Sequence, residues 1–244
     1  MPKIITYLSK LEQNNNREWF HSHKAEYQEA FGEFEEIIAG LMAKLGKDDA
    51  RILNFQPKEL TFKLMRDTRF SNDKSPYNPA FRCHISPAGK LPVPVGYFLC
   101  IRPGDRSFLG GGLFADMFRD ATAMVRDYIN GHGAELQEIV ESPQFKDSKA
   151  GFAIKGSALK NVPKGYNAEH PMAQYLKNKS WYIEDNFNDE RLENKDTFIQ
   201  FAAERFRLMA PFNEYLNQAL KVFKMHQREI QNILKTEVKG VRPP

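Results

Sequence analysis

The sequence predicts an α+β fold in which an antiparallel sheet of about four or more strands packs against N-terminal and C-terminal helices. Apolar residues recur every three or four positions before residue 46, alternate with other residues between 60 and 113, and then return to helical spacing. The sheet and the helices each need the other to bury an apolar face, and no Gly-, Ser- or Pro-rich linker separates them. We therefore expect one domain over residues 1–244, with a short frayed tail at 240–244.

The N-terminal third is expected to form one long helix that begins near Asn15. Glu18 follows Asn15 by three residues, as in a capping box, and Gly46 suits the C-cap. Between these ends the apolar residues keep a spacing of three or four and predict one buried face. They are Trp19, Phe20, Tyr27, Phe31, Phe34, Ile38, Leu41, Met42 and Leu45.

Residues 60–113 have the period of two that is typical of strands. The connections are too short for helical crossovers and carry turn residues at 86–89 and 102–105, so we expect an antiparallel meander of four strands. The alternating apolar residues are Phe62 and Leu64, then Phe81, Cys83 and Ile85, then Tyr97, Leu99 and Ile101.

The rest of the chain is expected to be mainly helical, with a first helix near Asp116 and short additional strands at 151–157 and 181–187. Pro171 and Pro211 are each interpreted as a proline in the first turn of a helix. This interpretation predicts two long C-terminal helices.

The composition is that of a folded protein, since 41% of the residues are hydrophobic and 27% are charged. Polar residues occur throughout the opening segment, and no window approaches the run of about 18 apolar residues that a membrane span requires. Cys83 and Cys100 lie in strand-like segments and are expected to be reduced core thiols, with a cross-strand pair as the alternative. We therefore expect a cytoplasmic protein with no membrane partner.

Positive charge is concentrated in one segment, although the net charge is only +4. Residues 58–106 hold nine basic and four acidic residues, and the most polar stretch is 65–78. Guanidinium groups suit the bidentate capture of carboxylate or phosphate, so we predict a site for a small anionic ligand. Its candidate ligand-binding residues are Arg66, Arg69, Lys74 and Arg82, with Asp67, Asp73, Tyr77 and His84 supporting them.

A structural role for this stretch is the first alternative. Arg66 and Arg69 would then pair internally with Asp67 and Asp73 and make a long hairpin connection rigid, while a helical face binds another protein. A nucleic-acid surface is the second alternative, because Phe70, Tyr77 and Phe81 lie among basic residues. No recognisable nucleic-acid motif supports that reading, which makes it the less favoured one.

Three glycines, Gly110, Gly111 and Gly112, follow a predicted strand and precede the helix near Asp116. Their amides are added to the predicted anion site, as a nest close to a helix N-terminus. A bulge or close backbone packing is the favoured alternative for them. His84 shares a sheet face with Arg82 by alternation and is expected at the surface.

The sequence identifies no catalytic residue, cofactor or reaction, so it leaves open whether the protein is an enzyme. Asp67, Asp73 and His84 lack the spacing of known metal motifs, and we predict no metal site. The polar residues around Asn15 and Trp19 are interpreted as helix caps and an aromatic anchor.

Four segments together resemble a family of bacterial and fungal proteins known as domain of unknown function 2461. They are Asn14–Phe20, Arg66–Tyr77, Gly110–Gly112 and Pro163–Pro171. The resemblance covers most of the chain and supports the single-domain prediction. It implies no reaction, substrate or catalytic residue.

Overall fold

The computed structural model describes residues 2–69, 71–114, 118–146 and 152–235. Phe70, the helix start expected near Asp116, the first residue of the strand expected at 151–157 and the tail at 240–244 lie outside the described residues. Within the part of the chain that is described, no helix is both long and apolar enough to cross a membrane.

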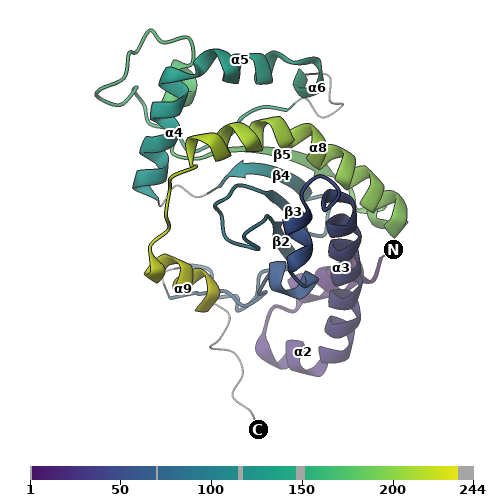
Figure 1. The fold of residues 1–244 in the computed structure, drawn as a ribbon. Coiled ribbons are helices and arrows are strands. Elements are labelled where there is room, and N and C mark those ends of the chain that lie inside the picture. The colour runs from purple at the N-terminus through teal and green to yellow at the C-terminus, as the bar shows by residue number, and fades with distance from the viewer. Residues whose placement is uncertain (1, 70, 115–117, 147–151, 236–244) are drawn as a thin grey trace. The chain divides into compact units, whose positions relative to one another are not determined.

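The fold is α+β, as predicted, and Figure 1 shows the order of its elements along the chain. Five strands form one sheet in the order β1-β2-β3-β4-β5, and β2 pairs antiparallel with both β1 and β3. The strands are β1 (Thr61–Phe62), β2 (Phe81–Ile85), β3 (Tyr97–Ile101), β4 (Ser107–Leu113) and β5 (Trp181–Phe187). The α-helices are α1 (Lys3–Gln13), α2 (Arg17–Ser22), α3 (Lys24–Leu45), α4 (Arg119–Gly131), α5 (Gly133–Glu141), α6 (Pro143–Lys146), α7 (Ala173–Leu176), α8 (Lys195–Ala219) and α9 (Gln227–Lys235). Short 3-10 turns lie at Ala50–Asn54, Pro57–Leu60 and Asp189–Leu192.

The chain divides into two compact units, each built from separate stretches of sequence. Unit 1 comprises Met1–Lys90, Tyr97–Leu109 and Asp185–Phe206, and unit 2 comprises Leu91–Gly96, Gly110–Glu184 and Arg207–Pro244. The strands β4 and β5 and the helix α8 each contribute residues to both units. The expectation of one domain stays a prediction, which the cooperativity of unfolding can test.

Unit 1 has a core of aromatic and aliphatic side chains between its helices and the strands β2 and β3. Helix α3 forms because its buried residues, among them Phe34, Ile38, Leu41 and Leu45, recur every three or four positions. The ring of Phe34 stacks on that of Phe81 in β2 with their centroids 5.4 Å apart, and both side chains are fully buried. Each such buried side chain stabilises the fold by about 1.5–3 kcal/mol.

The N-terminal helices begin and end at other residues than the sequence indicates. Helix α1 was not expected, and the long predicted helix is interrupted at His23, between α2 and α3. The cap of α2 is Asn16, whose side chain accepts a hydrogen bond from the Trp19 amide at 2.9 Å. The prediction of Asn15 as the cap is therefore wrong by one residue, whereas Gly46 caps α3 as predicted.

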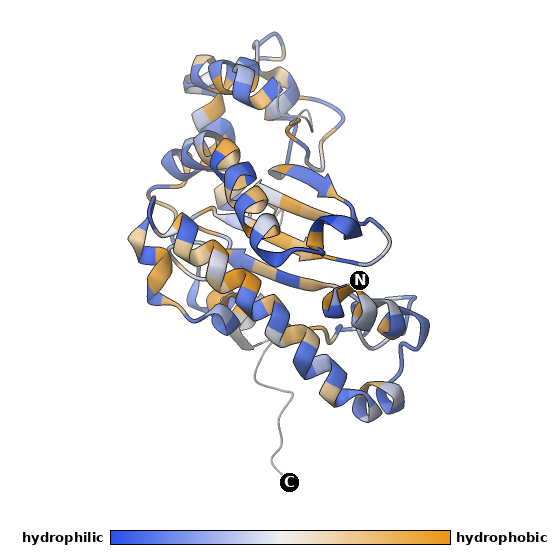
Figure 2. Ribbon diagram, turned by 90° about the vertical axis from the view of Figure 1, so that its right-hand side faces the viewer, coloured by the Kyte–Doolittle hydropathy of each residue, from blue (hydrophilic) through white to orange (hydrophobic). Residues whose placement is uncertain are grey.

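Unit 2 is held by side chains that bond to loop carbonyls and by a buried tryptophan. Trp181 is fully buried, and its indole Nε1 donates to the Tyr175 carbonyl at 2.9 Å. The Asn213 amide donates to the Gly96 carbonyl at 2.9 Å, so a buried amide fixes the short stretch 91–96 to α8. Figure 2 shows that hydrophilic and hydrophobic positions alternate along the helices.

Both proline predictions for the C-terminal region are wrong. Pro211 lies inside α8, which is one continuous helix instead of two. Pro171 precedes α7 without belonging to it, because that helix begins at Ala173 after a cap at Met172.

Of the two additional strands expected, the one at 181–187 is confirmed as β5. In the described part of 151–157, a single bridge between Lys155 and Tyr182 takes the place of the other.

The two cysteines are free and buried, which confirms the prediction of reduced core thiols. The β2–β3 register places Cys83 opposite Leu99 and Cys100 opposite Arg82, so the thiols are not cross-strand partners. Burial raises the pKa of the Cys83 thiol.

Candidate functional site

The polar stretch 65–78 forms a closed hairpin connection between β1 and β2, within unit 1. A bridge joins Met65 to Tyr77, the Arg66 amide donates to the Pro76 carbonyl at 2.9 Å, and the Asn78 amide donates to the Leu64 carbonyl at 2.7 Å. These backbone bonds hold the two ends of the stretch together. We call residues 65–78 the polar hairpin.

Arg66 and Asp73 form an ion pair across the polar hairpin. Oδ1 of Asp73 also accepts a hydrogen bond from the Ser75 amide at 2.9 Å. Hydrogen bonds from Ser75 and from Arg66 both lower the pKa of the Asp73 carboxyl. The internal pairing that the sequence left as an alternative is therefore present for Arg66.

The second internal pair joins Arg69 to Asp67, with Nη2 and Oδ2 2.6 Å apart. Hydrogen bonds from Arg69 lower the pKa of Asp67 to about 2. The Arg69 side chain is 77% exposed, and exposed pairs of this kind contribute little to stability. Lys74 is also exposed and donates to the Thr68 carbonyl at 3.0 Å.

A cavity of about 370 Å³ lies beside the polar hairpin in unit 1. Of the four predicted ligand-binding side chains of this region, Arg66 lines it, and Arg69, Lys74 and Arg82 do not. The residues that line it are Glu12, Asn15, Arg66, Asp73, Ser75, Tyr77, Asn78, Pro79 and Arg102.

Tyr77 forms part of the cavity wall and is only 4% exposed. Its ring stacks on that of Phe20 with a centroid separation of 4.4 Å. The side chain of Asn15 holds its backbone through two hydrogen bonds. Tyr77 is therefore held in place by both its ring and its main chain.

Arg102 is a lining residue that the sequence analysis did not select. It follows β3 directly, and Ser107 fixes its backbone by accepting from its amide and donating to its carbonyl, both at 3.0 Å. Its Nε atom is buried and has no hydrogen-bond partner among the described residues. The Arg-Pro-Gly-Asp sequence at 102–105 resembles an ordinary turn, which is why Arg102 was counted only as part of the basic segment.

The charges around Arg102 are already paired with each other. Glu12 accepts from Nη2 of Arg106 at 2.6 Å, and Asp73 accepts from Arg66. Within the described residues, Arg102 forms neither an ion pair nor a side-chain hydrogen bond. The cavity therefore contains one guanidinium group that no carboxylate balances.

Arg82 lies on β2, opposite Cys100, which is two residues before Arg102. Its Nη2 donates to the Lys63 carbonyl at 3.0 Å, and its guanidinium lies 5.7 Å from the centre of the Phe62 ring. Its Nε is buried and without a hydrogen-bond partner among the described residues. Burial lowers the pKa of Arg82, the charge of Arg102 also lowers it, and Cys100 acts in the opposite direction.

His84 is 7% exposed, so the prediction of a surface histidine is wrong. Alternation along β2 places it on the sheet face of Arg82, as expected. Cys83 lies on the opposite face of β2. Both faces of the strand are packed, so His84 is buried as well as Cys83.

The three glycines lie inside β4, in unit 2, and not in a turn before a helix. A Cβ atom at Gly111 would come within 2.9 Å of the Asn213 Oδ1 atom. At Gly112, where φ is +104°, a Cβ atom would approach the Trp181 carbonyl oxygen to 2.4 Å. Close packing, the alternative favoured from the sequence, explains why no side chain is accommodated at Gly111 and Gly112.

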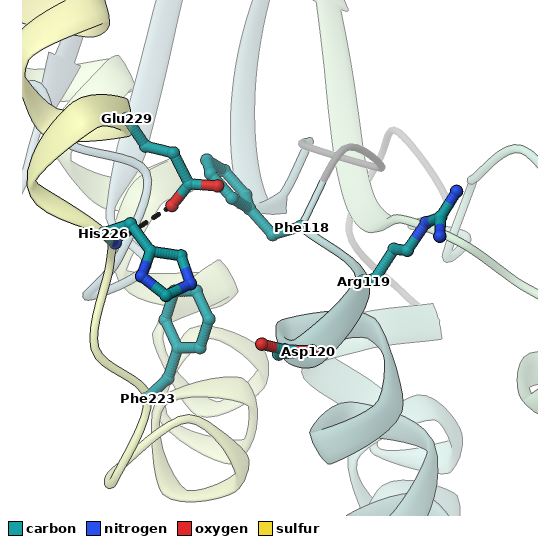
Figure 3. A pocket seen from close by; sticks show the side chains of 6 residues that line it. All are labelled: Phe118, Arg119, Asp120, Phe223, His226 and Glu229. Carbon is teal, nitrogen blue, oxygen red and sulfur yellow. Dashed lines mark hydrogen bonds between the residues drawn. The ribbon is translucent and has the colours of Figure 1, made fainter.

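Two further hollows lie in unit 2. The one in Figure 3 has a volume of about 230 Å³ and is lined by Phe118, Arg119, Asp120, Phe223, His226 and Glu229. Glu229 accepts a hydrogen bond from the His226 backbone amide at 3.0 Å, and Arg119 points away from both (Figure 3). The Glu229 carboxylate is thus engaged in capping α9. The charged groups of this hollow therefore do not converge on one point.

The other hollow, of about 390 Å³, lies between α4, α5 and α8. It is lined by three glutamates, Glu135, Glu138 and Glu214, together with Tyr128, Ile139, Ser142, Gln144, Pro211, Tyr215 and Gln218. The Tyr215 hydroxyl donates to the His132 carbonyl at 3.2 Å. The negative charge of the three glutamates makes this hollow unsuited to the anionic ligand that the sequence predicts.

The fold and the site define an α+β protein with a polar hairpin beside an arginine-containing cavity. The model of the family described as "Conserved hypothetical protein (DUF2461)" matches residues 3–215. The chain belongs to this family, which confirms the resemblance seen in the sequence. No curated protein and no solved structure matches the chain.

Proposed function

We propose that the protein binds a small anionic ligand, bearing a carboxylate or a phosphate, in the cavity beside the polar hairpin. Arg102 is the principal binding residue and Arg66 the second cation of the site. Arg69 and Lys74, which the sequence also indicated, have no part in this proposal, because they lie on the exposed side of the hairpin.

The buried Nε of Arg102 is the observation that carries the proposal. A buried donor without a partner costs about 1–3 kcal/mol, and more when the group is charged. An anionic oxygen placed in the cavity would balance the charge of the Arg102 guanidinium, which lines it. Asp73 and Glu12 supply no such oxygen to Arg102, since their carboxylates accept from Arg66 and Arg106.

Neutral groups at the cavity wall are suited to the rest of an anionic ligand. Asn78 and Ser75 line the cavity and are partly exposed. Amides and hydroxyls donate to oxygen acceptors without adding charge. The site is expected to hold a ligand of a few heavy atoms.

A structural role for the polar hairpin is supported by a different observation. The Arg66–Asp73 pair, the Ser75 amide and the Asn15–Tyr77 contact all tie the hairpin to itself or to the N-terminal helices. Under this second candidate function the hairpin is rigid and no ligand binds. Arg102 separates the two candidates because none of those structural contacts involves its side chain.

Thermal shift and calorimetric titration with phosphate, sulfate and acetate test the proposal, against chloride at matched ionic strength. A ligand that binds only the native state raises the melting temperature by mass action. Arg102→Gln is expected to abolish the shift. Arg51→Gln is the matched control, since Arg51 is 71% exposed and pairs with Asp49 away from the cavity.

An unchanged ligand-dependent shift in the Arg102→Gln variant would place the anion elsewhere. No shift with any of the three anions in the wild-type protein would leave the structural candidate as the better one. Circular dichroism of each variant checks that the fold is retained.

A further inference from the structure

Arg82 and Arg102 have the same unusual environment on the same part of the sheet. Each guanidinium has a buried Nε without a hydrogen-bond partner among the described residues. Neither arginine forms an ion pair in that part of the chain. A carboxylate normally accompanies a partly buried arginine, because an unpaired charge removed from water is costly.

The register of the sheet brings these two arginines together. Arg82 is the direct cross-strand partner of Cys100, and Arg102 follows Cys100 by two residues, directly after the end of β3. Diagonal neighbours of this kind have Cα atoms about 7–8 Å apart, which long side chains can span. The charge of Arg102 is near enough to lower the pKa of Arg82.

Like charges held this close repel each other unless a negative group lies between them. Arg82 lies near the Phe62 ring, donates to the Lys63 carbonyl and is paired across the sheet with Cys100. Within the part of the chain that is described, no carboxylate pairs with Arg82 or with Arg102. The protein therefore maintains two neighbouring positive charges next to the cavity that Arg102 lines.

We propose that the neighbouring positive charges of Arg82 and Arg102 together favour a dianionic group in this cavity, so that the ligand of this site is a phosphate monoester. This inference rests on the proposed function, because it places the same ligand against the same Arg102. A phosphate monoester carries close to two negative charges at neutral pH and offers three acceptor oxygens. Arg102 lines the cavity and can donate to one of these oxygens, and Arg82, which does not line it, adds a second positive charge near Arg102. A carboxylate brings only a single negative charge.

Four small probes separate the charge of the ligand from its shape at a fixed pH of about 8, where phosphate is mainly dianionic. Inorganic phosphate and sulfate are dianions, and dimethyl phosphate and methyl sulfate are tetrahedral monoanions. Titration calorimetry of the full chain is expected to give affinities about tenfold or more higher for the dianions, since each meets a second fixed positive charge.

Substitutions then assign the second charge to Arg82. Arg82→Gln is expected to weaken phosphate and sulfate about tenfold while it leaves the monoanions nearly unchanged. Arg82→Lys keeps the charge and is expected to retain most of the preference for dianions. Arg102→Gln is expected to weaken all four probes.

The outcomes distinguish this inference from the proposed function. Monoanions that bind within about threefold of the dianions, or an Arg82→Gln variant with an undiminished preference, would overturn the inference and leave anion binding at Arg102 intact. If no probe binds the wild-type protein, both fail. Should Arg82→Gln not fold, the wild-type preference and the Arg82→Lys variant still decide the matter.

Discussion

The side-chain amide of Asn15 pairs with both backbone groups of Tyr77, a residue 62 positions away in the sequence. Nδ2 donates to the Tyr77 carbonyl at 2.9 Å, and Oδ1 accepts from the Tyr77 amide at 3.1 Å. An asparagine in this position copies the pairing of a neighbouring strand. It joins the turn between α1 and α2 to the polar hairpin.

Asn15→Ala is therefore expected to destabilise the protein by about 1–2 kcal/mol, because both groups of the Tyr77 backbone lose their partners in a partly buried setting. Denaturant unfolding with an unchanged m-value measures the loss. Asn14→Ala is the neighbouring control: its amide donates to the Lys10 carbonyl at the exposed end of α1. That variant should stay within about 0.5 kcal/mol of wild type, and equal losses in both would contradict the role given to Asn15.

The contact between Asn15 and Tyr77 shows why the sequence predicted the presence of helices and strands better than the residues at which they begin and end. Three consecutive asparagines precede α2, and local rules cannot decide which one caps the helix. Asn16 does so, because Asn15 is engaged by a residue that the chain brings close only after folding. The apolar periods of α3 and of the strands are local properties, and they were predicted correctly.

An ion pair in unit 1 provides a second test of stability. Asp185 and Arg205 are hydrogen bonded through Nε, and their side chains are 4% and 13% exposed. Asp185→Asn should destabilise the protein by about 3 kcal/mol, because it removes a buried carboxylate that is hydrogen bonded to a buried guanidinium.

The exposed pair of the polar hairpin is the control for that variant. Asp67→Asn removes the carboxylate that pairs with Arg69, at a site where water replaces the lost contact. Thermal denaturation should show no measurable change for Asp67→Asn and a clear loss for Asp185→Asn. A comparable loss in both variants would mean that burial does not decide the strength of these pairs.

Two glycine substitutions are expected to act in opposite directions. In Gly112→Ala the added Cβ atom would lie 2.4 Å from the Trp181 carbonyl oxygen, at a residue whose φ is +104°. We therefore expect the free energy of unfolding to fall by about 3 kcal/mol or more, or the variant not to fold. Gly32 lies in α3, where an added Cβ atom would meet nothing within 4 Å apart from its chain neighbours and the backbone of its own helix, so Gly32→Ala should stabilise the protein by about 0.5–1 kcal/mol. Melting temperatures of the two variants, relative to wild type, check both signs. A tolerated Gly112→Ala would contradict the close packing of β4.

The site was predictable from the sequence only in part. The density of charge at 65–78 drew attention to the polar hairpin, and the internal pairs of Arg66 and Arg69, which the sequence left as an alternative, are present. Arg102 was missed, because its importance depends on a buried Nε without a partner, and no local pattern encodes the absence of a neighbour. The cross-strand position of Arg82 could have pointed to it once the register was known.

Unfolding is expected to be a single cooperative transition, although the chain forms two compact units. The strands β4 and β5 and the helix α8 contribute residues to both units, so neither unit can unfold without breaking elements of the other. Scanning calorimetry should give one peak whose calorimetric and van't Hoff enthalpies agree. Asp185→Asn in unit 1 and a destabilising change in unit 2 should move the same peak, and two resolved peaks would refute the single-domain prediction.

A nucleic-acid-binding surface is the least favoured interpretation of the basic segment 58–106. Arg66 and Arg69 are neutralised by Asp73 and Asp67, and Lys74 is bonded to a backbone carbonyl. Outside residues 58–106 the chain has one more acidic than basic residue, which disfavours a long phosphate backbone. We therefore expect weak binding of a single-stranded oligonucleotide that is indifferent to its sequence.

Titration of a labelled oligonucleotide at several salt concentrations measures the number of phosphates contacted, because log K falls with log salt by about 0.7 per phosphate on a single strand. A site built around Arg82 and Arg102 can contact one or two phosphates, so we expect a slope no steeper than about −1.5. Arg102→Gln should flatten the slope further, while Arg51→Gln, in an exposed pair with Asp49, should leave it unchanged. Tight binding at physiological salt, with a slope that implies roughly six or more contacts, would place the nucleic-acid surface first and the small-anion site second.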